Sequence, residues 1–135
     1  MPERFADMAS TVAQLLVQVV GPGRTGIATP DELTGLMPFA RALRDGSPRD
    51  RLNDYARITV DVFDSDYDRG AAMAESIAAF LEPGRLRLGP VLIDRVEIDS
   101  APQEVTPWSP GIFRFEARYT IVSRRHRVAL SLIHI

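Results

Sequence analysis

Residues 113–121 read FRFEARYTI and alternate strictly between apolar and polar side chains. A period of two residues is typical of a β-strand, because successive side chains point to opposite faces of the sheet. The apolar set should face a core: Phe113, Phe115, Ala117, Tyr119 and Ile121. The polar set should face away from it: Arg114, Glu116, Arg118 and Thr120. The stretch therefore predicts a strand over residues 112–122 in a sheet with one buried face.

Three earlier segments also predict strands. Residues 55–63 alternate just as clearly, with Ile58, Val60 and Val62 opposite Arg57, Thr59 and Asp61. Residues 91–99 put Leu92, Val96 and Ile98 on one face, but Asp94 interrupts that face, which indicates a sheet end or a shift in register. Residues 37–44 place Met37, Phe39 and Leu43 together, and Pro38 restricts that strand to an edge or to its first residues.

Two segments have apolar residues at steps of three and four, the spacing of an amphipathic helix. The first covers residues 3–20 and ends at the Gly-Pro-Gly of residues 21–23. It covers the sheet or forms an oligomer seam. The second follows Asp64 and Asp66, whose carboxylates suit a helix N-terminus, and runs to about Leu81.

The order helix, strand, strand, helix, strand, strand predicts one α+β domain over residues 1–135. We expect two layers: a four- or five-stranded, mostly antiparallel sheet with both helices on one face. Residues 21–36 predict a loop with one possible helical turn at 29–33. Residues 45–54 predict a polar loop, and 100–111, which hold three prolines, a stiff extended one. The role of the C-terminal segment 126–135 stays open. Its apolar part, from Val128 to Ile135, is a fifth strand, a docking arm or foreign sequence.

The composition excludes several kinds of chemistry. The chain lacks cysteine, which rules out disulfides and thiolate catalysis, and its two histidines, His126 and His134, are too few for a histidine-built metal site. All 16 cations are arginine, yet the net charge is −2, so no global basic footprint indicates nucleic acid. No apolar run is long enough for a membrane span. We expect a chain that is made and folded in a cytoplasm.

No residue pattern predicts a catalytic, cofactor-binding or metal site. Asp64, Asp66, Asp68 and Glu75 match four positions of a calcium loop, but Arg69 replaces the required glycine and a helical pattern already begins at Tyr67. These acids are therefore predicted to cap a helix. The carboxylates of Glu97, Asp99 and Glu104 fit solvated strand positions, and Ser123 with His126 lacks the third group of a triad. The chain is predicted not to be an enzyme.

Four segments together resemble the tail terminator, or tail-completion, proteins of bacteriophages with long non-contractile tails. They are TPDEL (29–33) leading into LMPFAR (36–41), ITVDVFD (58–64), the alanine-rich helix that follows, and FRFEARYTI (113–121) ending in Ser123-Arg124-Arg125. The resemblance covers roughly residues 29–125, and the last ten residues depart from it.

The resemblance implies a structural virion protein without catalysis or cofactor. Such proteins form a hexameric ring that caps the tail tube at its head-proximal end, stops tube polymerisation and presents a surface to the head–tail connector protein. DNA is only cargo that passes through the ring, and no membrane is involved. Two alternatives stay open: another ring-forming tail or head–tail connector protein, and a small-molecule-binding α+β domain.

Two surfaces are candidates for contacts with partners. The charged face of the last strand, with Arg114, Glu116 and Arg118, is expected to hold subunits together, because the helices should cover only the opposite face. Asp61 or Glu97 could instead pair with these arginines within one chain. The loops that carry Arg49, Arg51 and Trp108 are expected to meet the tube or the connector. Trp108 could equally be a lid on the core.

Overall fold

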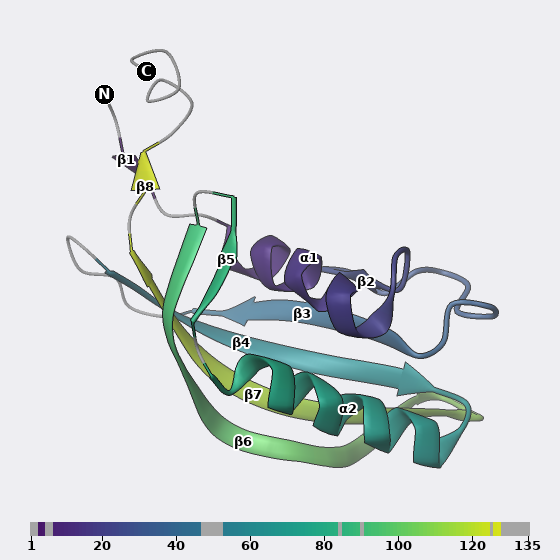
Figure 1. The fold of residues 1–135 in the computed structure, drawn as a ribbon. Coiled ribbons are helices and arrows are strands. Elements are labelled where there is room, and N and C mark those ends of the chain that lie inside the picture. The colour runs from purple at the N-terminus through teal and green to yellow at the C-terminus, as the bar shows by residue number, and fades with distance from the viewer. Residues whose placement is uncertain are drawn as a thin grey trace.

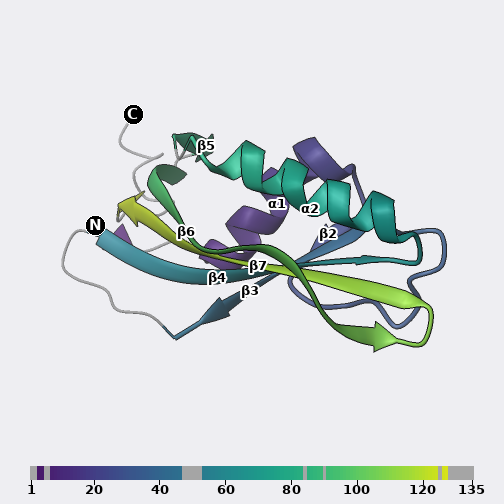
Figure 2. The same ribbon diagram turned by 90° about the horizontal axis from the view of Figure 1, so that it is seen from below.

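The computed structural model describes residues 3–4, 7–46, 53–83, 85–89, 91–124 and 126–127, and it confirms the α+β class. Two helices, α1 (Met8–Val20) and α2 (Tyr67–Leu81), lie side by side on one face of a curled sheet (Figures 1 and 2). The sheet has six strands, in the spatial order β2 (Thr25–Gly26), β3 (Phe39–Asp45), β4 (Asn53–Asp64), β7 (Ile112–Arg124), β6 (Val91–Ser109) and β5 (Leu86–Leu88).

The sheet has more strands than the four or five that were predicted, but it is mostly antiparallel as expected, because only the pairing of β2 with β3 is parallel. The additional strands β2 and β5 have two and three residues, which is too short for an alternating pattern to be visible in the sequence. β2 also pairs with β3 in parallel, through Thr25 with Ala40 and Gly26 with Arg41, so the sheet is mixed.

The antiparallel pair β4–β7 forms the centre of the sheet. Val60 lies opposite Ala117 and Ile58 opposite Tyr119, so the apolar sets of the two strands share the face beneath the helices. All four side chains belong to the main core. This confirms the predicted orientation of both strands. It also leaves Arg114, Glu116 and Arg118 on the opposite face of the sheet.

The first helix is shorter than predicted. It begins at Met8, where the Asp7 side chain accepts a hydrogen bond from the Ser10 amide at 3.2 Å. Glu3–Arg4 form a short strand, β1, which pairs with β8 (His126–Arg127) in a separate two-stranded sheet. The predicted start at residue 3 was too early, because Glu3 and Arg4 belong to β1.

The prediction of a loop over residues 100–111 was wrong. These residues continue β6, which pairs with β7 up to Ser109 and Ile112, and only a tight turn at Pro110 and Gly111 separates the two strands. Because β5 pairs only with residues 91–93, the rest of β6 is a sheet edge, where prolines are tolerated. Pro102 and Pro107 lie at two irregularities of the β6–β7 register.

A bulge in β6 explains the irregular pattern of residues 91–99. The register shifts between Ile93 and Arg95, which confirms a shift at Asp94 as one of the two expected explanations. Ile93 is consequently the fully buried residue on the helix side, whereas Leu92 is only partly buried.

A second, smaller core lies on the face away from the helices. It contains Leu33, Phe39 and Phe63, with Leu36, Met37 and Ile112 packed against them. The segment before β3 therefore covers one end of this face, and its turn lies at 34–36 instead of forming a helical turn at 29–33. On β3 the residues beneath α1 are Ala40 and Ala42, so the predicted grouping of Phe39 with Leu43 belongs to the face opposite the helices.

Some predictions fall outside the described residues. Arg49 and Arg51 do so, as does the tail from Val128 to Ile135. Within the described ranges, neither helix is long and apolar enough to cross a membrane.

Candidate protein-binding face

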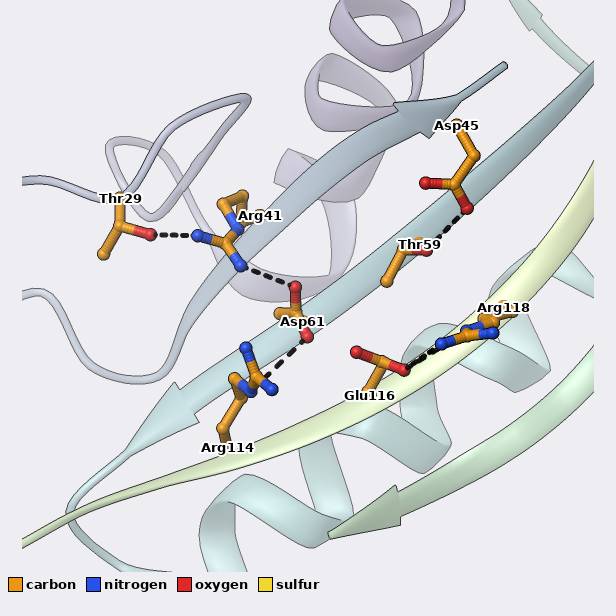
Figure 3. Close-up of polar contacts among 8 residues, drawn as sticks. All are labelled: Thr29, Arg41, Asp45, Thr59, Asp61, Arg114, Glu116 and Arg118. Carbon is orange, nitrogen blue, oxygen red and sulfur yellow. Dashed lines mark hydrogen bonds and ion pairs between the residues drawn. The ribbon is translucent and has the colours of Figure 1, made fainter. Parts of the chain in front are cut away.

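The candidate site is the sheet face that the helices leave uncovered, here called the open face. It is formed by alternate residues of β3, β4, β7 and β6, and it is rich in arginines and carboxylates. Figure 3 shows a part of it in which Arg41, Asp61 and Arg114 converge from three neighbouring strands. The predicted interface residues Arg114, Glu116 and Arg118 all lie on this face.

Asp61 is a buried carboxylate on an otherwise polar face, with a side chain that is only 2% exposed. Its Oδ2 atom accepts a 2.8 Å hydrogen bond from Arg41, and the Nε atom of Arg114 lies 4.0 Å from its Oδ1 atom. Arg41 also donates to the hydroxyl of Thr29 at 2.8 Å. Asp61 is thus the intramolecular partner that the sequence analysis left open, and Arg114 is held beside it within one chain.

Two aromatic rings pack against the Arg41 side chain of this cluster. Trp108 meets Phe63 edge to face with ring centroids 5.5 Å apart, and the Arg41 guanidinium lies over both rings, at 5.1 Å from Phe63 and 5.5 Å from Trp108. Trp108 lies on β6 and not on a loop, and it is 46% exposed. One part of the indole therefore packs on the protein while the other part is open to contact.

Glu116 and Arg118 form a more exposed pair further along β7. The Arg118 guanidinium lies 3.2 Å from Glu116, and the exposed fractions of the two side chains are 61% and 16%. A pair this exposed contributes only about 0–1 kcal/mol to folding. Among the predicted interface residues, Arg118 is therefore the one whose charge contributes least to the stability of the fold.

The curled sheet also forms a groove on the open face, with a volume of about 600 Å³. The sequence did not predict this groove, because its walls come from four strands whose relative positions only the fold determines. It is lined by Asp45, Tyr55, Arg57, Ile58, Glu97, Asp99, Arg118, Tyr119 and Thr120. Two of its carboxylates accept hydrogen bonds from hydroxyl groups: Asp45 from Thr59 at 3.4 Å and Asp99 from Thr120 at 2.6 Å.

The acids before α2 have structural partners. Asp66 is the N-cap of the helix and accepts from the Arg69 amide at 3.0 Å, which confirms the capping prediction. Asp64 is buried and receives two 2.7 Å hydrogen bonds from the Arg69 guanidinium. Burial acts to raise the pKa of Asp64, but the hydrogen bonds from Arg69 and from the Asp66 amide outweigh it and lower the pKa below its ordinary value.

Asp61, the acid three residues before Asp64, does not join this group. Asp61 lies on the open face, whereas Asp64 lies on the helix side. Within the described part of the chain, no group of three or more histidine, aspartate or glutamate side chains is arranged to hold a metal ion.

No protein-family model matches the chain, and no curated protein is significantly similar to it.

Proposed function

We propose that the chain is a structural virion protein that forms a ring on the end of a phage tail tube. The ring would end tube polymerisation and give the head–tail connector a joining surface. The open face is the observation that carries this proposal, because the helices bury only one side of the sheet (Figure 2). The other side presents Trp108 and Arg118, residue types that are enriched at protein interfaces.

The position of the resembling segments supports the proposal. The segment 36–41 leads into β3, residues 58–64 belong to β4, the alanine-rich helix is α2, and residues 113–121 belong to β7. β3, β4 and β7 are neighbours in the sheet, and α2 packs on β4 and β7. The resemblance to tail terminator proteins thus falls on one continuous part of the fold, and it implies a hexamer, a tube partner and a connector partner.

Charge reversal at Arg118 tests the role of the open face. Arg118→Glu should leave the circular dichroism spectrum unchanged, because the side chain is mostly exposed. It should change ring formation, measured by light scattering, or the capping of isolated tail tubes, measured by electron microscopy, because Arg118 lines the groove on this face. The reversed charge is repeated at every subunit contact. Arg114 is less suitable, because a glutamate there would lie beside the buried Asp61.

Glu82→Arg is the matched control. It reverses one exposed charge at the end of α2, away from the open face, and should leave assembly unchanged. Equal assembly and equal capping by wild type and Arg118→Glu would mean that this part of the open face is only solvated. A wild-type protein that neither forms rings nor caps tubes would refute the proposed function itself.

The groove favours one alternative function, a small-molecule-binding domain. Its volume of about 600 Å³ is within the range of ligand cavities, and it offers both carboxylates and guanidinium groups. A ligand screen by thermal shift distinguishes this function from a ring. A bound metabolite with no assembly on tubes would favour the alternative. Polymerisation of the protein into tubes, instead of capping, would favour another ring-forming tail protein.

A further inference from the structure

Two exposed cations lie at the β5 edge of the sheet. Arg85 precedes β5 and Arg87 lies within it, and neither makes an ion pair or a hydrogen bond in the described part of the chain. Leu86 and Leu88 pack against the main core on the helix side. The alternation of the strand therefore places Arg87 on the side of the open face. Two neighbouring guanidinium groups without acceptors form a surface that suits carboxylates.

The groove on the open face contains carboxylates that lack a cation. Asp45 and Asp99 make no ion pair among the described residues, and each accepts only the hydroxyl hydrogen bond given above. The third acid, Glu97, makes an exposed pair with Arg95 at 3.1 Å. The groove also holds two arginines, Arg57 and Arg118, of which Arg118 pairs with Glu116. Its three carboxylates outnumber these arginines, so the groove can accept further positive charge.

We propose that the groove of one copy binds Arg85 and Arg87 of a second copy. This inference rests on the proposed function, because it identifies the contact that repeats around the ring. Neither arginine lines the groove of its own chain. β5 is the last strand at one end of the sheet, whereas Asp45 lies on β3 near the other end. The two arginines and the groove therefore lie at different places on one chain. A head-to-tail contact that closes into a ring requires such an arrangement.

The unpaired carboxylates make this contact favourable. Guanidinium–carboxylate hydrogen bonds are shorter and stronger than neutral ones. No ion pair of Asp45 or Asp99 has to break before the arginines of the second copy bind. The contact should weaken as salt is added, because exposed charges are screened over about 8–10 Å at 0.1–0.15 M salt.

A charge-swap experiment tests the proposal. The first variant, Arg85→Glu with Arg87→Glu, has an acidic edge and a native groove. The second, Asp45→Arg with Asp99→Arg, has a native edge and a basic groove. Each variant alone places like charges together at every junction, and half-assembly should need a protein concentration at least about tenfold higher. Assembly is measured by native mass spectrometry, or on isolated tail tubes if the free protein is monomeric.

The equimolar mixture of the two variants gives the decisive result. In an alternating ring, a native edge meets a native groove at one junction and an acidic edge meets a basic groove at the next. The mixture should therefore assemble nearly as well as wild type. Asp68→Arg with Glu82→Arg, two exposed positions of the α2 layer, is the matched control and should assemble normally.

Each other outcome overturns the proposal. If the first variant assembles like wild type, the ring forms without these arginines. If both variants fail and the mixture also fails, the edge and the groove do not face each other. Circular dichroism checks that each variant is folded. If a charge-reversed variant misfolds, an alanine variant replaces it: Arg85→Ala with Arg87→Ala for the β5 edge, and Asp99→Ala for the groove. The proposed function fails separately, when the wild type itself neither forms rings nor caps tubes.

Discussion

Tyr119 is a fully buried residue whose hydroxyl group has no hydrogen-bond partner among the described residues. A buried hydroxyl without a partner costs about 1–3 kcal/mol. We therefore expect Tyr119→Phe to raise the free energy of unfolding by about 1 kcal/mol, measured by urea denaturation. Tyr67→Phe is the control, because Tyr67 is 45% exposed, and it should change stability little.

The pH dependence of this substitution has a definite sign. Burial, and to a lesser extent the charge of Glu75, raises the pKa of Tyr119 far above its ordinary value. An unfolded tyrosine loses its proton near pH 10. Above that pH the folded state still holds a proton that the unfolded state has lost, so the stability of the wild type falls as pH rises. The advantage of Tyr119→Phe should therefore widen above about pH 10, and a constant difference would contradict this.

Asp64→Asn should weaken the junction between β4 and α2. The substitution removes a charge that accepts two hydrogen bonds from Arg69. The expected loss is about 1–3 kcal/mol at neutral pH, since hydrogen bonds to charged groups are involved. Because the folded-state pKa of Asp64 is lowered, its contribution is present above about pH 4 and is lost as pH falls below that value. Wild type and variant should therefore converge in acid, whereas the exposed control Asp68→Asn should have little effect at any pH.

Single residues differ in how far the sequence predicts their environment. The positions of Arg114, Glu116 and Arg118 followed from the alternation of one strand. The burial of Asp61 did not, because Arg41, which pairs with it, lies on another strand and itself packs against Trp108 only in the fold. The groove was unpredictable for the same reason.

At the scale of elements, Gly70 determines how closely α2 lies on the sheet. A Cβ atom at this position would lie 2.8 Å from the Phe115 ring and 3.0 Å from the Asp64 side chain. Alanine normally stabilises a helix by about 1 kcal/mol relative to glycine. Here the overpacking should prevail, and we expect Gly70→Ala to destabilise the protein by about 1–3 kcal/mol in thermal or urea unfolding. Ser76→Ala, at an exposed position of the same helix, should be neutral or slightly stabilising.

The long strands β4 and β7 were predictable because their side chains alternate between apolar and polar over many residues, even though Thr59 and Asp61 on the polar side of β4 are buried. β6 was predictable only in its first half. Pro102 and Pro107 are typical of a loop, and only the knowledge that β5 ends its pairing at residues 91–93 makes this part of β6 an edge that accepts proline. Edge status is a property of the whole sheet, so no local pattern contains it.

At the scale of the whole molecule, the two sheet faces differ in what covers them. The helix side holds the main core, whereas the open face has only the small cluster around Leu33, Phe39 and Phe63 at one end. Trp108 lies beside that cluster and is supported from below by Phe63. A half-exposed tryptophan on a rigid support, next to arginines, is the usual composition of an interface hot spot.

Trp108→Ala tests whether this end of the molecule meets a partner. The loss of the contacts with Phe63 and Arg41 should lower the free energy of unfolding by only about 1–2 kcal/mol, because nearly half of the indole is already exposed. Capping of tail tubes, or ring formation, should fall much more than stability does. Trp108→Phe keeps an aromatic ring on Phe63 and should retain most of the assembly. A large drop in unfolding temperature with unchanged assembly would instead identify Trp108 as a lid that shields the Arg41–Asp61 pair from water.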